Sequence, residues 1–289
     1  MIKRKNFYET IFGKPEPAEQ EQNEVIRKAV SNLNNASQIS DINDQDWIVV
    51  PQSFSRLNYQ FSFSPARLSY CPGVEEVSEG LGLQLENTSK DSLDREFIGN
   101  IKWFNALRTA RALGSQVIGL SEIRTASELL YRGMKSEIPV YDNSGKQINT
   151  KFLEQIFNDI YKVQAPWRAE WIDADFKKIG NSDNLELRYN HLFDASGEIS
   201  GYDSKPIGSD ALTENKQISL ADYLLSSYTP QGFPKLGTPK GNYHYFAPLL
   251  DNKSVAGLGA DSDGAYLGCV RNPDNEDSYL GVRLTRRSE

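Results

Sequence analysis

The pattern of apolar residues changes from helical to strand periodicity near residue 167. Before that point, apolar residues recur at intervals of three and four, the spacing of one buried helix face. Four ranges show this spacing: residues 25–33, 101–113, 121–133 and 150–162. Gly114 directly follows the clearest of them, at a position suited to a left-handed helix end. The sequence therefore predicts four helices, with short strands at residues 47–51 and 59–64 between the first two.

From residue 167 onward the chain alternates short apolar runs with turn residues. Residues 171–176 and 185–189 have the composition and alternation of strands. Residues 194–217 are mostly polar and are expected to form an excursion from the core. Residues 228–242 hold three Pro and three Gly, which favours an irregular surface loop.

The last stretch, residues 254–289, contains three runs in which every second residue is apolar. The runs are Ala256, Leu258 and Ala260; then Ala265, Leu267 and Cys269; then Leu280, Val282 and Leu284. Turn signals separate them at residues 261–264 and 272–275. This arrangement predicts a three-stranded antiparallel meander with its apolar set facing the core.

Because strand side chains alternate between faces, the intervening residues of the meander should point away from the core. Together with residues of the turns they form the candidate ligand-binding set: Gly257, Gly259, Gly264, Tyr266, Gly268, Val270, Arg271, Asn272, Asn275, Glu276, Asp277 and Tyr279. Rigid aromatic residues among small and polar ones are typical of antibody-like binding surfaces. An ordinary solvated meander remains the alternative.

Amino-acid composition limits the classes of binding partner that we expect. A net charge of −7 and an isoelectric point near 5.1 disfavour nucleic acid, which needs a basic surface. No apolar run approaches the ~20 residues of a transmembrane helix, and no apolar stretch of signal-peptide length follows the charged start. We therefore expect a soluble protein without membrane insertion or a secretory signal, leaving cytoplasm and virion as open locations. Only Cys71 and Cys269 are present, and both are expected to be buried thiols.

Two motifs stand at the two ends of the range 103–284. The first is Trp103-x-x-Ala106-x-x-x-Ala110-x-x-Leu113-Gly114, followed by Val117, Leu120 and Glu122; the second is Leu280-Gly281-Val282-Arg283-Leu284. They resemble the opening helices and the closing strand of the formylglycine-generating-enzyme branch of the C-type lectin fold. Residues 115–119 depart from the usual segment between the two helices of this family. The resemblance implies an α+β, C-type-lectin-like fold with two helices and a small antiparallel sheet. That domain would cover residues 95–289, after an N-terminal α and strand segment, residues 1–94.

Within that fold, a C-terminal segment of this kind resembles the variable proteins of diversity-generating retroelements. In these, a reverse transcriptase rewrites positions near the 3′ end of the gene, and the altered side chains bind a ligand. The resemblance implies a fixed apolar set and a variable outward set in residues 254–289. Its implied partner is a protein or glycan on another cell or virus, with Tyr266 and Tyr279 as expected anchors. A phage or virion assembly protein that uses the same face for oligomer contacts is the alternative.

Catalysis is not expected from the residues available. Catalytic members of the fold bind copper through paired cysteines or iron through a histidine cluster, whereas this chain has two cysteines and only His191 and His244. We therefore predict no enzyme activity, no cofactor and no metal. A metal-dependent hydrolase using Glu170, Asp173 and Asp175 is a less favoured alternative, since these residues also suit a strand with a solvated acidic face. Asp261 and Asp263 are compatible with a calcium-binding loop, but we favour a plain turn. The ligand, the host and the oligomeric state stay open.

Overall fold

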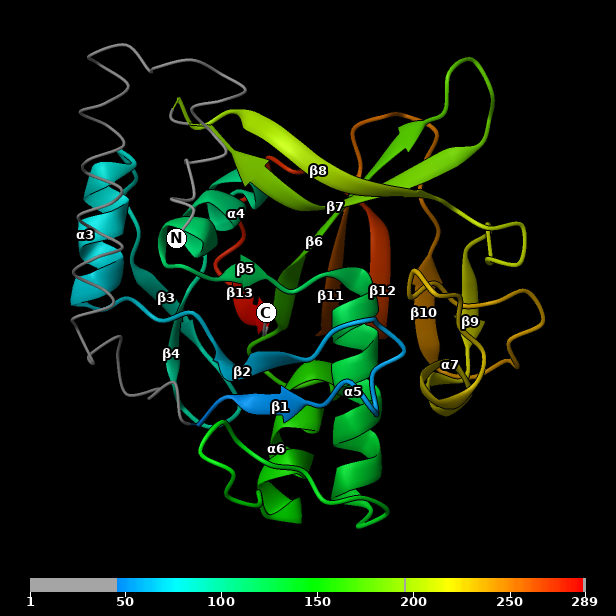
Figure 1. The fold of residues 1–289 in the computed structure, drawn as a ribbon, viewed down its shortest axis with the longest axis horizontal. Coiled ribbons are helices and arrows are strands. Elements are labelled where there is room, and N and C mark those ends of the chain that lie inside the picture. Colours follow the sequence, from blue (N-terminus) through cyan, green and yellow to red (C-terminus); the bar gives the residue numbers. More distant parts are fainter. Residues whose placement is uncertain (1–45, 195, 288–289) are drawn as a thin grey trace, which may run out of the picture.

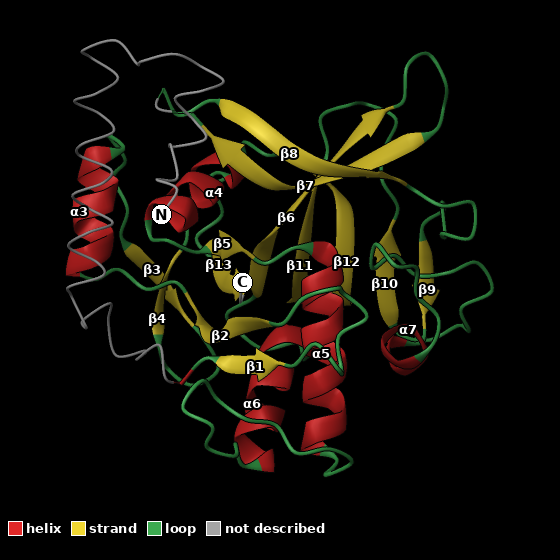
Figure 2. Ribbon diagram, viewed as in Figure 1, coloured by secondary structure: helices red, strands yellow, loops and turns green. Residues whose placement is uncertain are grey.

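A computed structural model describes residues 46–194 and 196–287 of the chain. These residues form a mixed α+β structure built around one large sheet, with helices on both of its faces (Figures 1 and 2). The predicted helix at residues 25–33 lies outside the described residues. The described helices are α3 (Pro72–Gly80), α4 (Trp103–Ala112), α5 (Leu120–Met134), α6 (Thr150–Tyr161) and α7 (Leu220–Leu225).

Thirteen strands are present in the described residues, eleven of them in the large sheet. The strands are β1 (Ile48–Val50), β2 (Phe61–Arg67), β3 (Asn87–Lys90), β4 (Glu96–Ile98), β5 (Gln116–Val117), β6 (Arg168–Lys178), β7 (Leu185–Phe193), β8 (Ile199–Pro206), β9 (Lys216–Ile218), β10 (Tyr243–Phe246), β11 (Val255–Asp261), β12 (Gly264–Arg271) and β13 (Leu280–Arg287). Along the sheet the order is β1-β2-β13-β6-β11-β12-β10-β9, while β3 and β4 form a separate pair.

The pairing of β6 with β11 is interrupted by a bulge on β6. Trp171 pairs with Gly257 of β11, yet Asp175, four residues later, pairs with Val255, so two extra residues stand on β6. Within this bulge, the Trp103 indole donates to the Ile172 carbonyl at 2.8 Å. Beyond the bulge β6 pairs with β7, and the β7–β8 hairpin runs along the top of Figure 1.

Two apolar cores lie on opposite faces of the sheet. One is covered by α5 and α6 and contains Leu258 and Leu267; the other is covered by α3 and α4 and contains Trp171, Leu280 and Val282. All nine apolar positions predicted for the terminal runs are buried. The alternation was therefore correctly assigned within each strand, but the last run faces a different core from the first two.

The prediction of a three-stranded meander is wrong for its third strand. Strands β11 and β12 form the expected antiparallel hairpin, whereas β13 pairs with β6 in parallel and with β2 and β5 antiparallel. Strand β6 thus separates β13 from β11, because the loop at residues 272–279 is long enough to cross the sheet face. The expectations of two helices and a small antiparallel sheet are also corrected, by five described helices and an eleven-stranded mixed sheet.

The chain before residue 95 contributes directly to the large sheet. Strand β2 pairs with both β1 and β13, and Phe61 and Phe63 are fully buried in the core beneath α5 and α6. Strand β8 lies within residues 194–217, so that segment is not simply the expected polar excursion. Its eight residues are almost all exposed, which explains why no apolar pattern marked the strand.

A buried ionic network ties β2, β6, β13 and α6 together. The guanidinium of Arg67 lies 2.6 Å from Asp159 and 3.0 Å from Glu170, and that of Arg283 lies 2.7 Å from Glu170. Arg168 also reaches Asp159, at 3.0 Å. Burial by itself raises the pKa of Asp159, but Arg67 and Arg283 outweigh it and hold this pKa below its usual range. Burial likewise raises the pKa of Glu170, but Arg283 and Arg67 outweigh it and lower the value. Both carboxylates are therefore ionised partners of buried arginines.

Candidate functional site

The predicted outward strand positions share one sheet face with residues of two further strands. Pairing registers align Gln217 of β9, His244 of β10, Tyr266 of β12 and Gly259 of β11 in one row across the sheet. The row is exposed at Gln217, half-buried at His244 and Tyr266, and buried at Gly259. We call this surface the C-terminal face and define it by Tyr266, Arg271, Tyr279, Trp167, His244 and Phe246.

Glycines form the floor on which two of these side chains lie. A Cβ atom on Gly259 would stand 2.7 Å from the Tyr266 hydroxyl oxygen, and one on Gly257 would stand 2.5 Å from Cδ of Arg271. The Arg271 guanidinium donates a hydrogen bond to the Tyr266 hydroxyl, and it lies 5.4 Å from the centre of the tyrosine ring. Gly257, Gly259 and Gly268 are consequently buried beneath a layer that a ligand would meet first.

Aromatic rings border this floor on two sides. Phe246 packs edge-on against Tyr266 with ring centres 6.1 Å apart, and Trp167 packs edge-on against Tyr279 at 6.3 Å. Trp167 is 46% exposed, although large apolar side chains are normally covered. The His244 ring stacks on Phe246, and its Nε2 atom lies 3.1 Å from the side-chain Nε2 of Gln217.

Sequence reasoning missed Trp167, His244 and Phe246. All three lie outside the terminal segment, and parallel pairing of β10 with β12 brings His244 and Phe246 to this face. The dense Pro and Gly content of residues 228–242 marked the preceding loop but not the strand after it. The alternation of Tyr243 and Tyr245, buried, with His244 and Phe246, half-buried, was the available signal.

The loop at residues 272–279 is held by its backbone. The carbonyl of Pro273 accepts from the Trp103 amide and that of Asp277 accepts from the Asn100 amide, both at 3.0 Å. The Thr88 hydroxyl donates to the Ser278 carbonyl at 2.7 Å. The side chains of this loop are consequently presented from a fixed main chain.

The predicted positions of the loop and strand differ in exposure. Asn272 and Glu276 are exposed, while Val270, Asn275 and Asp277 are half-buried. Burial, followed by the Asp277 carboxylate, raises the pKa of Tyr279, so its hydroxyl is protonated at neutral pH. The Tyr279 ring therefore lies between Trp167 and the charged side chains of Asp277 and Arg271.

The turn between β11 and β12 has the geometry of an ordinary tight turn. The Asp263 amide donates to the Asp261 carboxylate at 3.0 Å, and half-buried Gly264 adopts a φ of 130°. Such a conformation favours glycine. Among the described residues, no cluster of three or more His, Cys, Asp or Glu side chains is arranged to hold a metal ion.

The acidic residues considered for a hydrolase do not form a solvated face. Glu170 belongs to the buried ionic network, while Asp173 and Asp175 hold His191 between them, with Nδ1 2.5 Å from Asp173 and Nε2 3.2 Å from Asp175. Burial lowers the pKa of His191, but hydrogen bonds to Asp173 and Asp175 outweigh it and raise the value to about 9. At neutral pH both ring nitrogens therefore carry protons and donate to the carboxylates. The expectation of a solvated acidic strand face was wrong, because all three carboxylates are buried.

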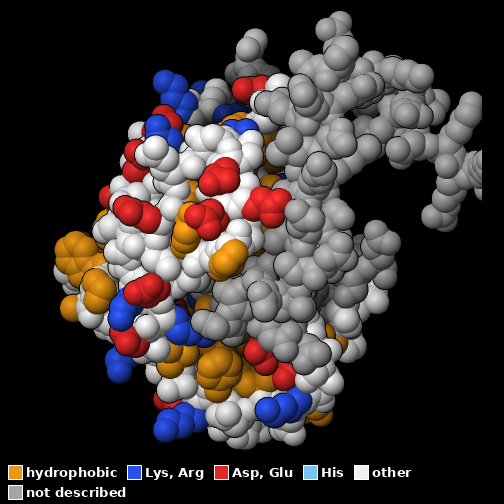
Figure 3. Space-filling view, turned by 90° about the vertical axis from the view of Figure 1, so that its left-hand side faces the viewer, with side chains coloured by type: hydrophobic (Ala, Val, Ile, Leu, Met, Phe, Trp, Pro, Cys, Tyr) orange, Lys and Arg blue, Asp and Glu red, His pale blue; other side chains and the backbone are white. Residues whose placement is uncertain are grey.

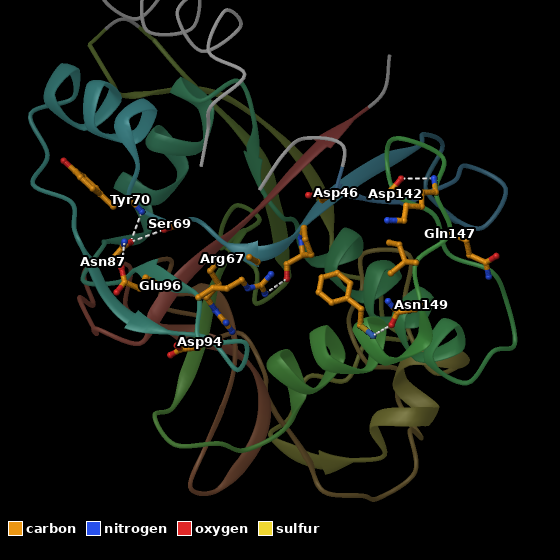
Figure 4. Close-up of a pocket in the computed structure, with 16 residues that line it drawn as sticks. Asp46, Arg67, Ser69, Tyr70, Asn87, Asp94, Glu96, Asp142, Gln147 and Asn149 are labelled. Atoms are coloured by element: carbon orange, nitrogen blue, oxygen red, sulfur yellow. Dashed lines mark hydrogen bonds between the residues drawn. The ribbon is translucent and has the colours of Figure 1, made fainter. Parts of the chain in front are cut away.

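A cavity of about 720 Å³ lies away from the C-terminal face. Figure 4 shows Arg67, Ser69, Tyr70, Asn87 and Glu96 on one side of it and Asp142, Gln147 and Asn149 on the other. Many of these polar groups already bind one another or their own turns: Asn87 accepts from the Tyr70 amide, and Asp142 accepts from Ser144 and Lys146. None of the predicted ligand-binding residues lines this cavity.

Acidic side chains are scattered over the side of the molecule that carries α3 (Figure 3), where Glu75, Glu76 and Glu79 are exposed. No helix in the described part of the chain is long and apolar enough to cross a bilayer. Comparison with known proteins gives no match to a family model, to a curated protein or to a solved structure.

Proposed function

We propose that this protein recognises a protein or glycan ligand on another cell or virus through its C-terminal face and has no enzyme activity. The observation that carries the proposal is the set of incompletely buried rings of Trp167, Tyr266, Tyr279 and Phe246, arranged over one rigid sheet face. Aromatic side chains supply large contact areas at a low entropic cost, and they dominate the energy of many interfaces.

A C-type-lectin-like fold and a diversified terminal segment belong to the same proposal. The fixed main chain of residues 272–279 supports it, since side chains at Asn275 and Glu276 can change without disturbing the hydrogen bonds that anchor the loop. The Asn272 side chain differs, because it accepts from the Asp274 amide at 3.1 Å. Neighbouring DNA provides the test. A reverse-transcriptase gene beside a near-copy of the 3′ end of this gene, differing mainly at adenines, would support diversification, and finding neither would count against it.

Ligand binding can be tested with the labelled full chain on a glycan array and on a panel of intact cells. We expect Trp167→Ala and Tyr279→Ala each to weaken binding to any target found by about tenfold or more, the range of an interface anchor. Leu236→Ala is the matched control, because Leu236 is 57% exposed and does not belong to the C-terminal face. Melting temperatures should stay nearly unchanged. Unaltered binding by both aromatic variants would contradict the proposal.

Assembly is the second candidate function, and the surface of the β7–β8 hairpin favours it. Leu192, Ile199 and Tyr202 are each about two-fifths exposed, and within residues 46–194 and 196–287 β8 pairs with β7 alone. Exposed apolar side chains on an edge strand are a common contact between subunits. Native mass spectrometry tests this candidate, since contacts through the hairpin predict a stable oligomer, and a monomer would count against assembly.

A further inference from the structure

A second cavity, of about 360 Å³, opens beneath the β7–β8 hairpin. Its lining residues come from α4, β6, β7, β8, β11 and the loops around residues 253 and 273: Trp103, Asp175, Lys177, Arg188, His191, Ile199, Tyr202, Lys253, Val255 and Pro273. The cavity borders the terminal segment through Val255 and Pro273 but contains none of the predicted ligand-binding residues. A volume of this size suits a small organic molecule.

Basic side chains predominate at this cavity. Lys177, Arg188 and Lys253 approach it from three different elements, and the protonated His191 ring, which is held by Asp173 and Asp175, also lines it. Asp175 is the one carboxylate among the described lining residues. Asp175 is already engaged, with its oxygens 3.2 Å from His191 and 3.3 Å from Lys177.

The other two cations differ in how far they are neutralised. Arg188 lies 2.7 Å from Glu186, whereas the Lys253 ammonium has no ion-pair partner in the described part of the chain. Lys177 and Arg188 already have carboxylate partners, so the attraction for an anion comes mainly from Lys253, whose charge no carboxylate of the described residues neutralises. The cleft therefore favours an anion beside Lys253.

The remaining wall is apolar and partly uncovered. Ile199 and Tyr202 are 38% and 43% exposed, and the Arg188 guanidinium lies 4.5 Å from the centre of the Tyr202 ring. Trp103 forms the buried end, where its indole nitrogen is occupied by the Ile172 carbonyl and only its ring is available for contact. An apolar ring placed here would cover side chains that otherwise face water.

We propose that this cavity binds a small organic anion in which one carboxylate or phosphate group is attached to an apolar ring. The anionic group pairs with Lys253 and reaches toward Lys177 and Arg188, while the ring lies against Trp103, Ile199 and Tyr202. The site is separate from the C-terminal face, so each can fail without the other.

Isothermal titration calorimetry of the full chain with phenyl phosphate and benzoate tests the proposal and distinguishes the two anionic groups. We expect at least one of them to bind with a dissociation constant below about 1 mM. Inorganic phosphate and benzyl alcohol, which each carry half of the proposed ligand, should bind at least about tenfold more weakly. Raising the ionic strength should weaken binding of the anion.

Variants locate the site. Lys253→Ala and Tyr202→Ala should each weaken binding by about tenfold, and Lys253→Arg should largely retain it. Lys151→Ala is the matched control, because Lys151 is an exposed lysine on α6 that does not line the cavity. Absence of binding by both probes up to about 10 mM would overturn the proposal. Equal binding of benzyl alcohol, or equal losses in Lys151→Ala and Lys253→Ala, would overturn it as well.

Discussion

Arg283 shows how one residue can join distant parts of the chain. Its side chain is fully buried and meets Glu170 of β6 and the Ser64 carbonyl of β2. Replacing it by Met removes the charge while keeping much of the volume, and leaves Glu170 with Arg67 as its remaining partner. We expect Arg283→Met to lower the free energy of unfolding by about 3–5 kcal/mol, because buried Glu170 loses one of its two counter-charges and the buried Ser64 carbonyl loses a donor. Urea denaturation measures this.

Lys90→Met is the matched control for that experiment. Lys90 pairs with Asp94 at 3.0 Å on the surface, with half of the lysine side chain exposed. Solvent screens such an exposed pair, so its loss should change stability little. Similar losses in the two variants would show that burial of the Arg283 pair has no special weight.

His191 gives the protein a predicted pH dependence. Its pKa in the folded protein is about 9, above the ordinary value of 6.5, so folding favours the protonated ring. The resulting stability is fully present below pH 6.5 and is lost as the pH rises through about 9. His191→Gln should lack this contribution. We therefore expect the difference in unfolding free energy between wild type and His191→Gln to shrink between these two values.

Urea denaturation of both proteins across this pH range provides the measurement. Subtracting one unfolding free energy from the other removes the contributions of groups that titrate alike in the two proteins. A difference that stays constant, or that grows with rising pH, would mean that the protonated ring is not held by Asp173 and Asp175. Chemical-shift titration of the His191 ring supplies an independent pKa.

At the scale of elements, the glycine floor couples β11 to β12. A methyl group on Gly259 would meet the Tyr266 hydroxyl at 2.7 Å and the Ala169 Cβ at 3.0 Å, so Gly259→Ala should cost about 1–3 kcal/mol by overpacking. Removing the ring with Tyr266→Ala should relieve part of that cost. We expect a double-mutant cycle by urea denaturation to give a coupling energy of about 1 kcal/mol.

Gly268→Ala is the matched control in the same sheet face. Its added methyl would lie 3.7 Å from the nearest Tyr266 atom, an ordinary contact distance. Coupling of Gly268→Ala with Tyr266→Ala should be close to zero. If the coupling energy between Gly259→Ala and Tyr266→Ala is also near zero, the Tyr266 ring does not pack on Gly259.

Local periodicity predicted most helices and strands, because those signals depend on residues close in sequence. The predicted helices at residues 101–113, 121–133 and 150–162 are confirmed by α4, α5 and α6. Helix α3 was missed, since Val74 and Val77 are its only buried apolar residues and give too short a stripe. Alternation likewise located β11, β12 and β13.

Pairing between distant strands was not predictable by the same reasoning. Nothing in the alternation of Leu280 and Val282 indicates whether their neighbour is β12 or β6, because a strand with one apolar face can pair on either edge. The same limitation explains why two of the six residues of the C-terminal face were missed. Tyr266, Arg271 and Tyr279 were found within the terminal segment, whereas His244 and Phe246 join them through a parallel pair that the sequence does not mark.

At the scale of the whole molecule, the predicted domain boundary at residue 94 can be tested by truncation. A chain of residues 95–289 would lack β1 and β2, and with them Phe61, Phe63 and the Arg67 side chain that bridges Asp159 and Glu170. Strand β13 would lose its partner β2, and two buried carboxylates would lose a counter-charge. Because stabilities of whole domains are only about 5–15 kcal/mol, we expect this truncated chain not to fold cooperatively.

Residues 46–289 retain these groups and serve as the control. Thermal melts followed by circular dichroism, with proton NMR dispersion as a second readout, compare the two chains. A sharp melt and a dispersed spectrum for residues 95–289 would show that the C-terminal part folds without β1 and β2, and would place the boundary where the sequence predicted it.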